Sequence, residues 1–219
     1  MSSPIVTVGT TTTDTSTARV LRNTYLLLSM TLMFSAVTAG ISMALKMPYM
    51  GLWMLLPYFV LLFLVEKNKN SSMGLLWVFA LTGWMGFSLG PVLNHYVGIS
   101  GFEPVLTALG GTATIFLGLS AYVLVTRKDF SFATGFLTTG MLVAFVAALA
   151  NAFLQIQALA LALTCMFLFL SSGMILWQTS QLIHGGERNY ISATVTLYVM
   201  IYNLFTTLLH LVGLGGGDD

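Results

Sequence analysis

The feature that most constrains this sequence is the spacing of its charged residues. Only 7% of its 219 residues are Asp, Glu, Lys or Arg, whereas 57% are hydrophobic. A charged side chain at the centre of a bilayer costs several kcal/mol, so charges in a membrane protein lie at or beyond the helix ends. The charge-free stretches of this chain are 23–45, 47–65, 70–102, 104–126, 130–186 and 189–217.

These stretches predict seven transmembrane helices. One span needs about 20 residues, so 70–102 is too short for two spans and a turn, while 130–186 is too long for one. The amides Asn151, Gln155 and Gln157 interrupt the apolar run of that longest stretch and divide it. A soluble chain of this length has too little interior to hide so much apolar surface. We therefore expect an all-α membrane protein, with spans near 23–45, 49–66, 73–95, 104–126, 131–151, 157–180 and 190–213.

The basic residues set the orientation, because cytoplasmic loops of membrane proteins carry an excess of Lys and Arg. With the N-terminus in the cytoplasm, Lys46 is the only basic residue in an outside loop. The inside segments then hold the other basic residues, which are Arg19, Arg22, Lys67, Lys69, Arg127, Lys128 and Arg188. We predict a cytoplasmic N-terminus and, since the number of spans is odd, a C-terminus on the opposite side. No basic patch indicates a nucleic-acid partner.

The N-terminal segment differs from the apolar remainder. Residues 1–18 are rich in Ser and Thr and have almost no large apolar side chains, so they cannot bury enough surface to order themselves. We expect a flexible cytoplasmic tail over 1–20, a seven-helix transmembrane domain over 21–213, and a short tail over 214–219. The first tail is either an idle leader or a handle that another protein grips.

The third span carries small residues that predict close helix packing. Gly83, Gly86 and Gly90 precede Pro91, and glycines four residues apart share a helix face on which a second backbone can approach closely. Pro91 has no backbone N–H group, so we expect a kink near the outer end of this helix. Such patterns are common in membrane helices, so this one predicts packing and not an activity.

Polar side chains in and near the last two spans are further candidates. Gln178 lies near the inner end of the sixth span, and Asn203 lies within the seventh, where we expect it to be buried. An amide in lipid needs a partner, so these residues either line a pore or pocket or bond to neighbouring helices. We expect His184 in the turn after the sixth span, as a plain loop residue or as a sensor of cytoplasmic pH.

The spans offer little for catalysis. An intramembrane aspartyl protease needs two carboxylates at membrane depth, and none is present at that depth. Ser171 and Ser172 have no histidine at the same depth, so we interpret them as packing residues rather than nucleophiles. His95, His210 and Glu103 lie on unlinked elements near the outer face and make only a weak metal site. We expect no catalytic residue, no metal and no cofactor.

Several separated motifs resemble the Bax-inhibitor (transmembrane Bax inhibitor motif) family. The third span reads LTGWMGFSLGP over residues 81–91 and resembles the glycine-proline signature of that family. The similarity extends over about residues 20–213 and implies a bundle in which six helices surround a central seventh. Its other segments are 112–116, 126–131, 175–179 and 197–205.

The resemblance also bears on ion conduction. Family members that leak calcium hold an aspartate in each of the last two helices, and this pair shares a proton and gates the pore with pH. The matching positions here are Gln178 and Met200, and residues 47–65 contain no Arg or Lys to supply the basic latch of those members. A proton-switched pair cannot operate without carboxylates. A pH-sensitive calcium or cation leak is therefore the less favoured alternative.

Bacterial members that modulate the membrane-anchored, ATP-dependent protease FtsH give the leading expectation. Similarity to them implies a non-enzymatic regulator in the bacterial inner membrane that binds FtsH and restrains its attack on other membrane proteins. The C-terminal tail is then periplasmic, and the tail over 1–20 offers the protease a flexible end to pull. The expected partners are FtsH and the lipid bilayer, whereas calcium is a doubtful ligand.

Overall fold

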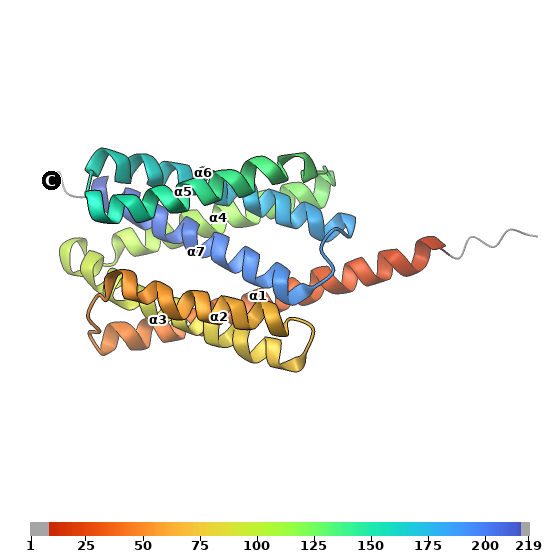
Figure 1. Cartoon of the computed structure of the whole chain (residues 1–219), viewed down its shortest axis with the longest axis horizontal. Coiled ribbons are helices and arrows are strands. Elements are labelled where there is room, and N and C mark those ends of the chain that lie inside the picture. Colours follow the sequence, from red (N-terminus) through yellow and green to blue (C-terminus); the bar gives the residue numbers. More distant parts are fainter. Residues whose placement is uncertain (1–8, 216–219) are drawn as a thin grey trace, which may run out of the picture.

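A computed structural model describes residues 9–215 as seven long α-helices and two short 3-10 helices, with no strand in that range (Figure 1). Seven helical segments of this range are long and apolar enough to cross a membrane, and the second of them, Gly51–Asn68, combines η1 and α2. The predictions of an all-α membrane protein and of seven spans are confirmed. In chain order the elements are α1 (Gly9–Ala44), η1 (Gly51–Met54), α2 (Leu55–Asn68), α3 (Ser72–Ser100), α4 (Glu103–Thr126), η2 (Ser131–Ala133), α5 (Thr134–Leu154), α6 (Gln157–His184) and α7 (Tyr190–Gly215).

The first helix starts earlier than the sequence predicts. α1 begins at Gly9, inside the predicted tail over 1–20, and its first turns project beyond the other helices (Figure 1). Residues 1–8 and 216–219, which belong to the two predicted tails, lie outside the described residues. The flexibility of both tails stays a prediction.

Two other helices run past their predicted limits and end at left-handed glycines. α3 and α6 are followed by Gly101 (φ 71°) and Gly185 (φ 73°). Glycine has no Cβ atom to clash in this conformation, so it ends a helix readily. The longest charge-free stretch divides at Gln155 (φ 54°), among the predicted amides, where α5 ends and α6 begins.

Six helices form two groups with α7 between them. α1, α2 and α3 pack together in one group, and α4, α5 and α6 form the other (Figure 1). α7 contacts α1, α2, α3, α4 and α6, whereas α5 packs on α6 at the edge of the bundle. The predicted central seventh helix is confirmed, and its Leu197, Tyr198 and Leu204 are almost fully buried.

Glycines join α3 to α1. A Cβ atom on Gly86 would collide with the carbonyl oxygen of Ser35. One on Gly90 would collide with the side chain of Ser42. Only glycine therefore lets the two backbones approach this closely. Pro91 is buried, and α3 continues through it without a break. The predicted packing glycines that face α1 in this way are Gly83, Gly86 and Gly90.

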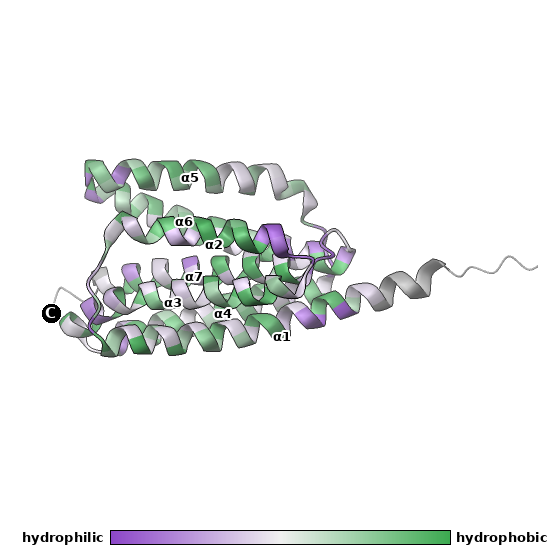
Figure 2. Cartoon of the chain, turned by 60° about the horizontal axis from the view of Figure 1, so that its bottom comes forward, coloured by the Kyte–Doolittle hydropathy of each residue, from purple (hydrophilic) through white to green (hydrophobic). Residues whose placement is uncertain are grey.

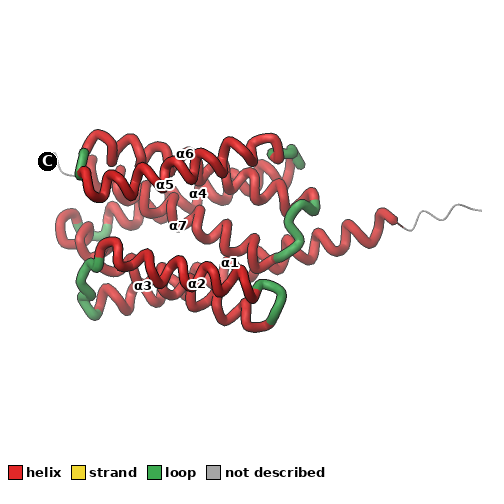
Figure 3. The backbone as a smooth tube through the Cα atoms, viewed as in Figure 1, coloured by secondary structure: helices red, strands yellow, loops and turns green. Residues whose placement is uncertain are grey.

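The loops lie at two opposite ends of the bundle (Figure 3). Hydrophilic residues gather at these ends, while the helices between them are largely hydrophobic (Figure 2). The end that we call the far end holds the last turns of α1 and α7 and the loops 45–50, 101–102 and 155–156. The other, which we call the basic end, holds seven of the eight Lys and Arg residues. Its loops are 69–71, 127–130 and 185–189.

Candidate functional site

The clearest polar feature inside the bundle is a stripe of residues along α7. Side chains four residues apart lie on one face of a helix. Four members of this stripe form hydrogen bonds to α1 or α3. Because lipid offers no water to satisfy polar groups, these bonds hold α7 against both helices. The α7 stripe consists of Thr194, Tyr198, Tyr202, Thr206 and His210.

Tyr198 is the centre of the α7 stripe and is 1% exposed. Its hydroxyl donates a hydrogen bond to the carbonyl oxygen of Thr82 at 3.1 Å. A tyrosine hydroxyl has a single proton, so Ser35 is the donor in the 2.5 Å bond between its hydroxyl and that of Tyr198. One side chain of α7 is therefore bonded to α1 and to α3 at once.

The stripe continues from Tyr198 toward the far end. Ser88 donates its proton to the carbonyl oxygen of Met85 at 2.7 Å, so the hydroxyl of Tyr202 donates to Ser88 at 3.2 Å. The hydroxyl of Tyr96 lies 3.1 Å from Nδ1 of His210, which makes this histidine part of the helix contact. Within residues 9–215, no three His, Cys, Asp or Glu side chains come together as a metal site would require.

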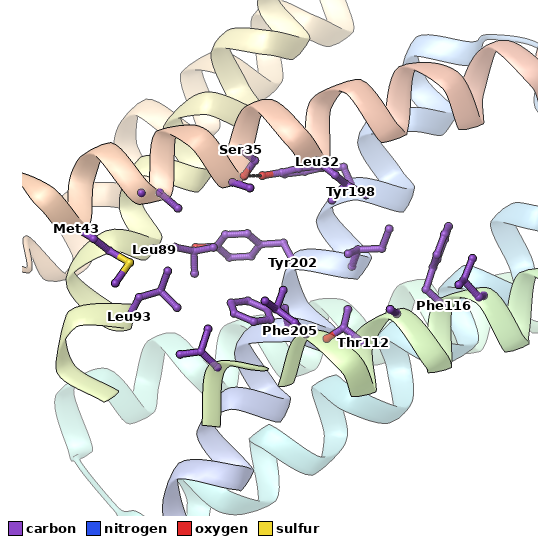
Figure 4. A pocket seen from close by; sticks show the side chains of 18 residues that line it. Leu32, Ser35, Met43, Leu89, Leu93, Thr112, Phe116, Tyr198, Tyr202 and Phe205 are labelled. Atoms are coloured by element: carbon purple, nitrogen blue, oxygen red, sulfur yellow. Dashed lines mark hydrogen bonds between the residues drawn. The ribbon is translucent and has the colours of Figure 1, made fainter. Parts of the chain in front are cut away.

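A pocket of about 570 Å³ lies beside the α7 stripe, between α1, α3, α4 and α7 (Figure 4). Its polar side chains are Ser35, Thr112, Tyr198 and Tyr202, and the rest of the lining is apolar. Thr112 donates to the carbonyl oxygen of Ala108 at 2.7 Å. The hydroxyl groups of the other three take part in the hydrogen bonds of the α7 stripe described above. The pocket therefore presents few free hydrogen-bonding groups to a ligand.

The pocket opens sideways, out of the bundle, between α1 and α4. Tyr25 of α1 and Phe116 of α4 close it toward the basic end, with their ring centroids 6.2 Å apart. The mouth therefore faces the surrounding membrane in the half of the bundle nearer the far end. Its exposed lining residues come from these two helices only and are Ala36, Gly40, Leu109, Ala113 and Leu117.

The predicted gating positions lie in the protein core. Gln178 is 2% exposed and Met200 is 6% exposed. The Nε2 group of Gln178 has no hydrogen-bond partner among the described residues, so the predicted bond to a neighbouring helix is not formed by this nitrogen. Asn203 is only partly buried, because it follows Tyr202 and points about 100° away from the α7 stripe.

His184 ties the loop 127–130 to the end of α6. It is the last residue of α6 rather than a loop residue. Its Nε2 atom lies 3.1 Å from the carbonyl oxygen of Arg127, and its Nδ1 atom lies 2.9 Å from that of Ser180. The contact with Arg127 holds the loop 127–130 against the end of α6.

Two further groups of hydrogen bonds lie in the loops of the basic end. Asp129 accepts hydrogen bonds from the hydroxyl and the backbone N–H group of Ser131, at 2.6 and 2.8 Å, and these bonds lower the pKa of its carboxyl group. The side-chain amide of Asn189 donates to the carbonyl oxygen of Lys69 at 3.0 Å and to the side chain of Asn70 at 2.8 Å. Hydrogen bonds thus join the loop 185–189 to the loop 69–71, and the loop 127–130 to the end of α6.

Comparison with known proteins decides which family this fold represents. The family model described as "Inhibitor of apoptosis-promoting Bax1" matches residues 17–217. The chain belongs to this family. A protein of Escherichia coli strain K12, named "Modulator of FtsH protease YccA", is 50% identical to it over 93% of each chain. An uncharacterized protein of Pseudomonas aeruginosa is 52% identical over 91% of each chain.

Membership of the Bax-inhibitor family confirms the resemblance found in the sequence. The α7 stripe was missed there, although its signal is visible as Thr and Tyr at four-residue spacing within the last span. In this bundle, hydroxyl groups carry most of the bonding between helices.

Proposed function

We propose that this chain is a non-enzymatic regulator of the bacterial inner membrane that binds FtsH and restrains its attack on other membrane proteins. The observation that carries this proposal is the 50% identity, over 93% of each chain, to a protein named as a modulator of FtsH protease. The match extends over nearly the whole of both chains, which supports a similar mode of action.

The architecture supports a role that works through contact. Glycine packing and the α7 stripe hold the bundle together, while the start of α1 projects from the basic end (Figure 1). We infer that FtsH engages this projecting N-terminal segment, as proposed for the tail over 1–20. The bundle then resists extraction and occupies the protease.

Reconstituted FtsH tests the proposal directly. FtsH and a membrane-protein substrate are placed in liposomes with an equimolar amount of this chain, and substrate loss is followed by gel electrophoresis. We expect several-fold slower degradation, and co-purification of the chain with FtsH. An unrelated seven-helix membrane protein at the same density is the control. Equal degradation rates with the chain and with this control would contradict the proposal.

The N-terminal handle is tested separately. Deletion of residues 2–18 removes the segment that precedes Arg19, including the first turns of α1, and keeps α1 from Arg19 onward. We expect FtsH to degrade this variant more slowly than the full chain, because the protease lacks an end to pull. An unchanged half-life of the variant would refute the hypothesis that FtsH pulls on this segment. Co-purification of the variant with FtsH would still test whether the two proteins bind.

A cation leak is the alternative function, and the structure offers little in its favour. Gln178 and Met200 occupy buried positions on α6 and α7, and neither side chain can ionise as the family's gating aspartates do. We expect little calcium release from loaded liposomes at neutral or mildly acidic pH. Some release should appear when Gln178→Asp and Met200→Asp are combined. Fast, acid-dependent release through the unmodified chain would favour the leak instead.

We also propose that the N-terminus is cytoplasmic and the C-terminus periplasmic. The support is the placement of seven of the eight Lys and Arg residues at one end of the bundle. Alkaline phosphatase fused after Asp219 should be active, and a fluorescent protein that folds only in the cytoplasm should stay dark there. The reverse result would overturn the orientation.

A further inference from the structure

The pocket between α1 and α4 has the length of one membrane leaflet. Its lining covers residues 32–43 of α1 and 105–117 of α4. At about 1.5 Å of rise per residue, these segments are roughly 16 to 18 Å long. The hydrocarbon core of a bilayer is about 30 Å thick, so each leaflet contributes about 15 Å. The pocket thus extends from the far end to about the middle of the membrane.

The size of the pocket suits a hydrocarbon chain. The pocket offers about 570 Å³ over the depth of one leaflet. An α-helix with its side chains is about 10–12 Å in diameter, whereas an extended acyl chain is much thinner and fills a space of this size.

The chemistry of the lining also favours hydrocarbon over a polar ligand. The hydroxyl of Tyr198 donates to Thr82 and accepts from Ser35, and the hydroxyl of Tyr202 donates to Ser88. A polar ligand would lose its own hydration and find these groups already bonded. Because the mouth opens inside the bilayer, hydrocarbon is also the medium that surrounds it.

We propose that this pocket is a binding site for one acyl chain of a phospholipid from the leaflet at the far end. The acyl chain enters between Gly40 of α1 and the exposed side chain of Leu109 of α4, and lies against Tyr198 and Tyr202 of α7. Lys46 follows Met43, which lines the pocket, by less than one helical turn and is the only basic residue at this end. Its ammonium group lies at the level of the headgroups, where it attracts the phosphate of a phospholipid. A phospholipid bound in this pocket therefore differs from the lipids that contact the outer faces of the helices.

Photo-crosslinking in lipid nanodiscs tests this site. The full chain is reconstituted in phosphatidylethanolamine and phosphatidylglycerol with a trace of phosphatidylglycerol that carries a diazirine on one acyl chain. Labelled peptides are then mapped by mass spectrometry. We expect segments 32–43 and 105–117 to be labelled several-fold more, per exposed residue, than the outer face of α5 around Leu142 and Val146. Even labelling of all lipid-facing helices would overturn the proposal.

A matched pair of glycines makes the test specific. Gly40 lines the pocket and Gly118 lies on the opposite face of α4, and a Cβ atom on either meets nothing within 4 Å. Gly40→Leu should therefore fill the pocket without disturbing the fold and lower pocket labelling at least five-fold. Gly118→Leu should leave it unchanged. Equal pocket labelling in both variants, each shown to be folded by its thermal unfolding, would contradict an acyl-chain site.

A diazirine-labelled fatty acid in the same nanodiscs separates a phospholipid from a free acid. Lys46→Gln should reduce labelling of the pocket by the phospholipid probe, because the phosphate loses its counter-charge. Stronger labelling by the fatty acid than by the phospholipid would show that the site does not select phospholipid and would overturn this assignment.

Discussion

The central helices α3 and α7 and the peripheral helices α2 and α5 are equally able to cross a membrane, yet they are built differently. Half of the residues in the spans of α3 and α7 are buried inside the protein, against 6% in α2 and 11% in α5. The buried faces of α3 and α7 combine aliphatic side chains with glycine, threonine and tyrosine, whereas large residues of α2 and α5 such as Phe63 and Leu142 point outward. Lipid is as apolar as leucine, so hydrophobicity does not drive these helices together. Close backbone approach and hydrogen bonds do.

The largest effect is expected from a large side chain placed in the glycine contact between α3 and α1. Gly90→Leu forces a side chain into Ser42 of α1, so we expect a loss of about 3 kcal/mol in stability, or failure to fold. Gly98→Leu on the same helix meets open space and serves as the control. Thermal unfolding in detergent measures both variants. Equal unfolding temperatures would show that the α1–α3 contact is not tightly packed.

The next test compares a buried and an exposed leucine. Leu204 of α7 is 0% exposed and Leu142 of α5 is 64% exposed. Leu204→Ala should cost about 2 kcal/mol, because neighbouring side chains lose their contacts around the cavity. Leu142→Ala should cost less than about 0.5 kcal/mol. Unfolding by denaturant in detergent micelles reports both values. A large cost at Leu142 would mean that α5 is buried against a partner in the micelle.

The smallest expected effect concerns the α7 stripe. Tyr198→Phe removes bonds to both Ser35 and Thr82, whereas Tyr202→Phe removes only the bond to Ser88. Hydrogen bonds between transmembrane helices contribute about 0.6 kcal/mol each on average. We therefore expect losses of about 1 and 0.5 kcal/mol, measured in the same unfolding assay. A reversed order would show that Tyr198 is not the centre of the stripe.

Much of the fold follows from the sequence, because lipid penalises charge so strongly. The gaps between charges predict the number of helices, and the amides near Gln155 predict the division between α5 and α6. The glycine spacing on α3 predicts a close contact, but it does not name α1 as the partner, since any helix with small residues would fit. The predicted ends of α3 and α6 fall before the observed ones at Gly101 and Gly185. A helix can continue into the headgroup region until a left-handed residue stops it.

The candidate site was harder to predict than the fold. Gln178 stands out as an amide in an apolar run, but its link to a gating pair came only through the resemblance to known proteins. Met200 was found only through that resemblance, since a methionine in an apolar run has no local signal. The pocket depends on how far α1 and α4 diverge beyond the contact of Tyr25 with Phe116. That divergence is a property of the whole bundle, and no segment of the sequence encodes it alone.

The position of α7 has a consequence for biogenesis. The helices that α7 contacts, which are α1, α2, α3, α4 and α6, all precede it along the chain, so they enter the membrane before their common contact surface has been synthesised. Ser35, Thr82 and Ser88 then have no tyrosine to bond to until translation reaches residue 202. Assembly of the two helix groups is therefore a late event, and a ribosome stalled before α7 leaves a chain whose polar groups remain open to capture by quality-control factors.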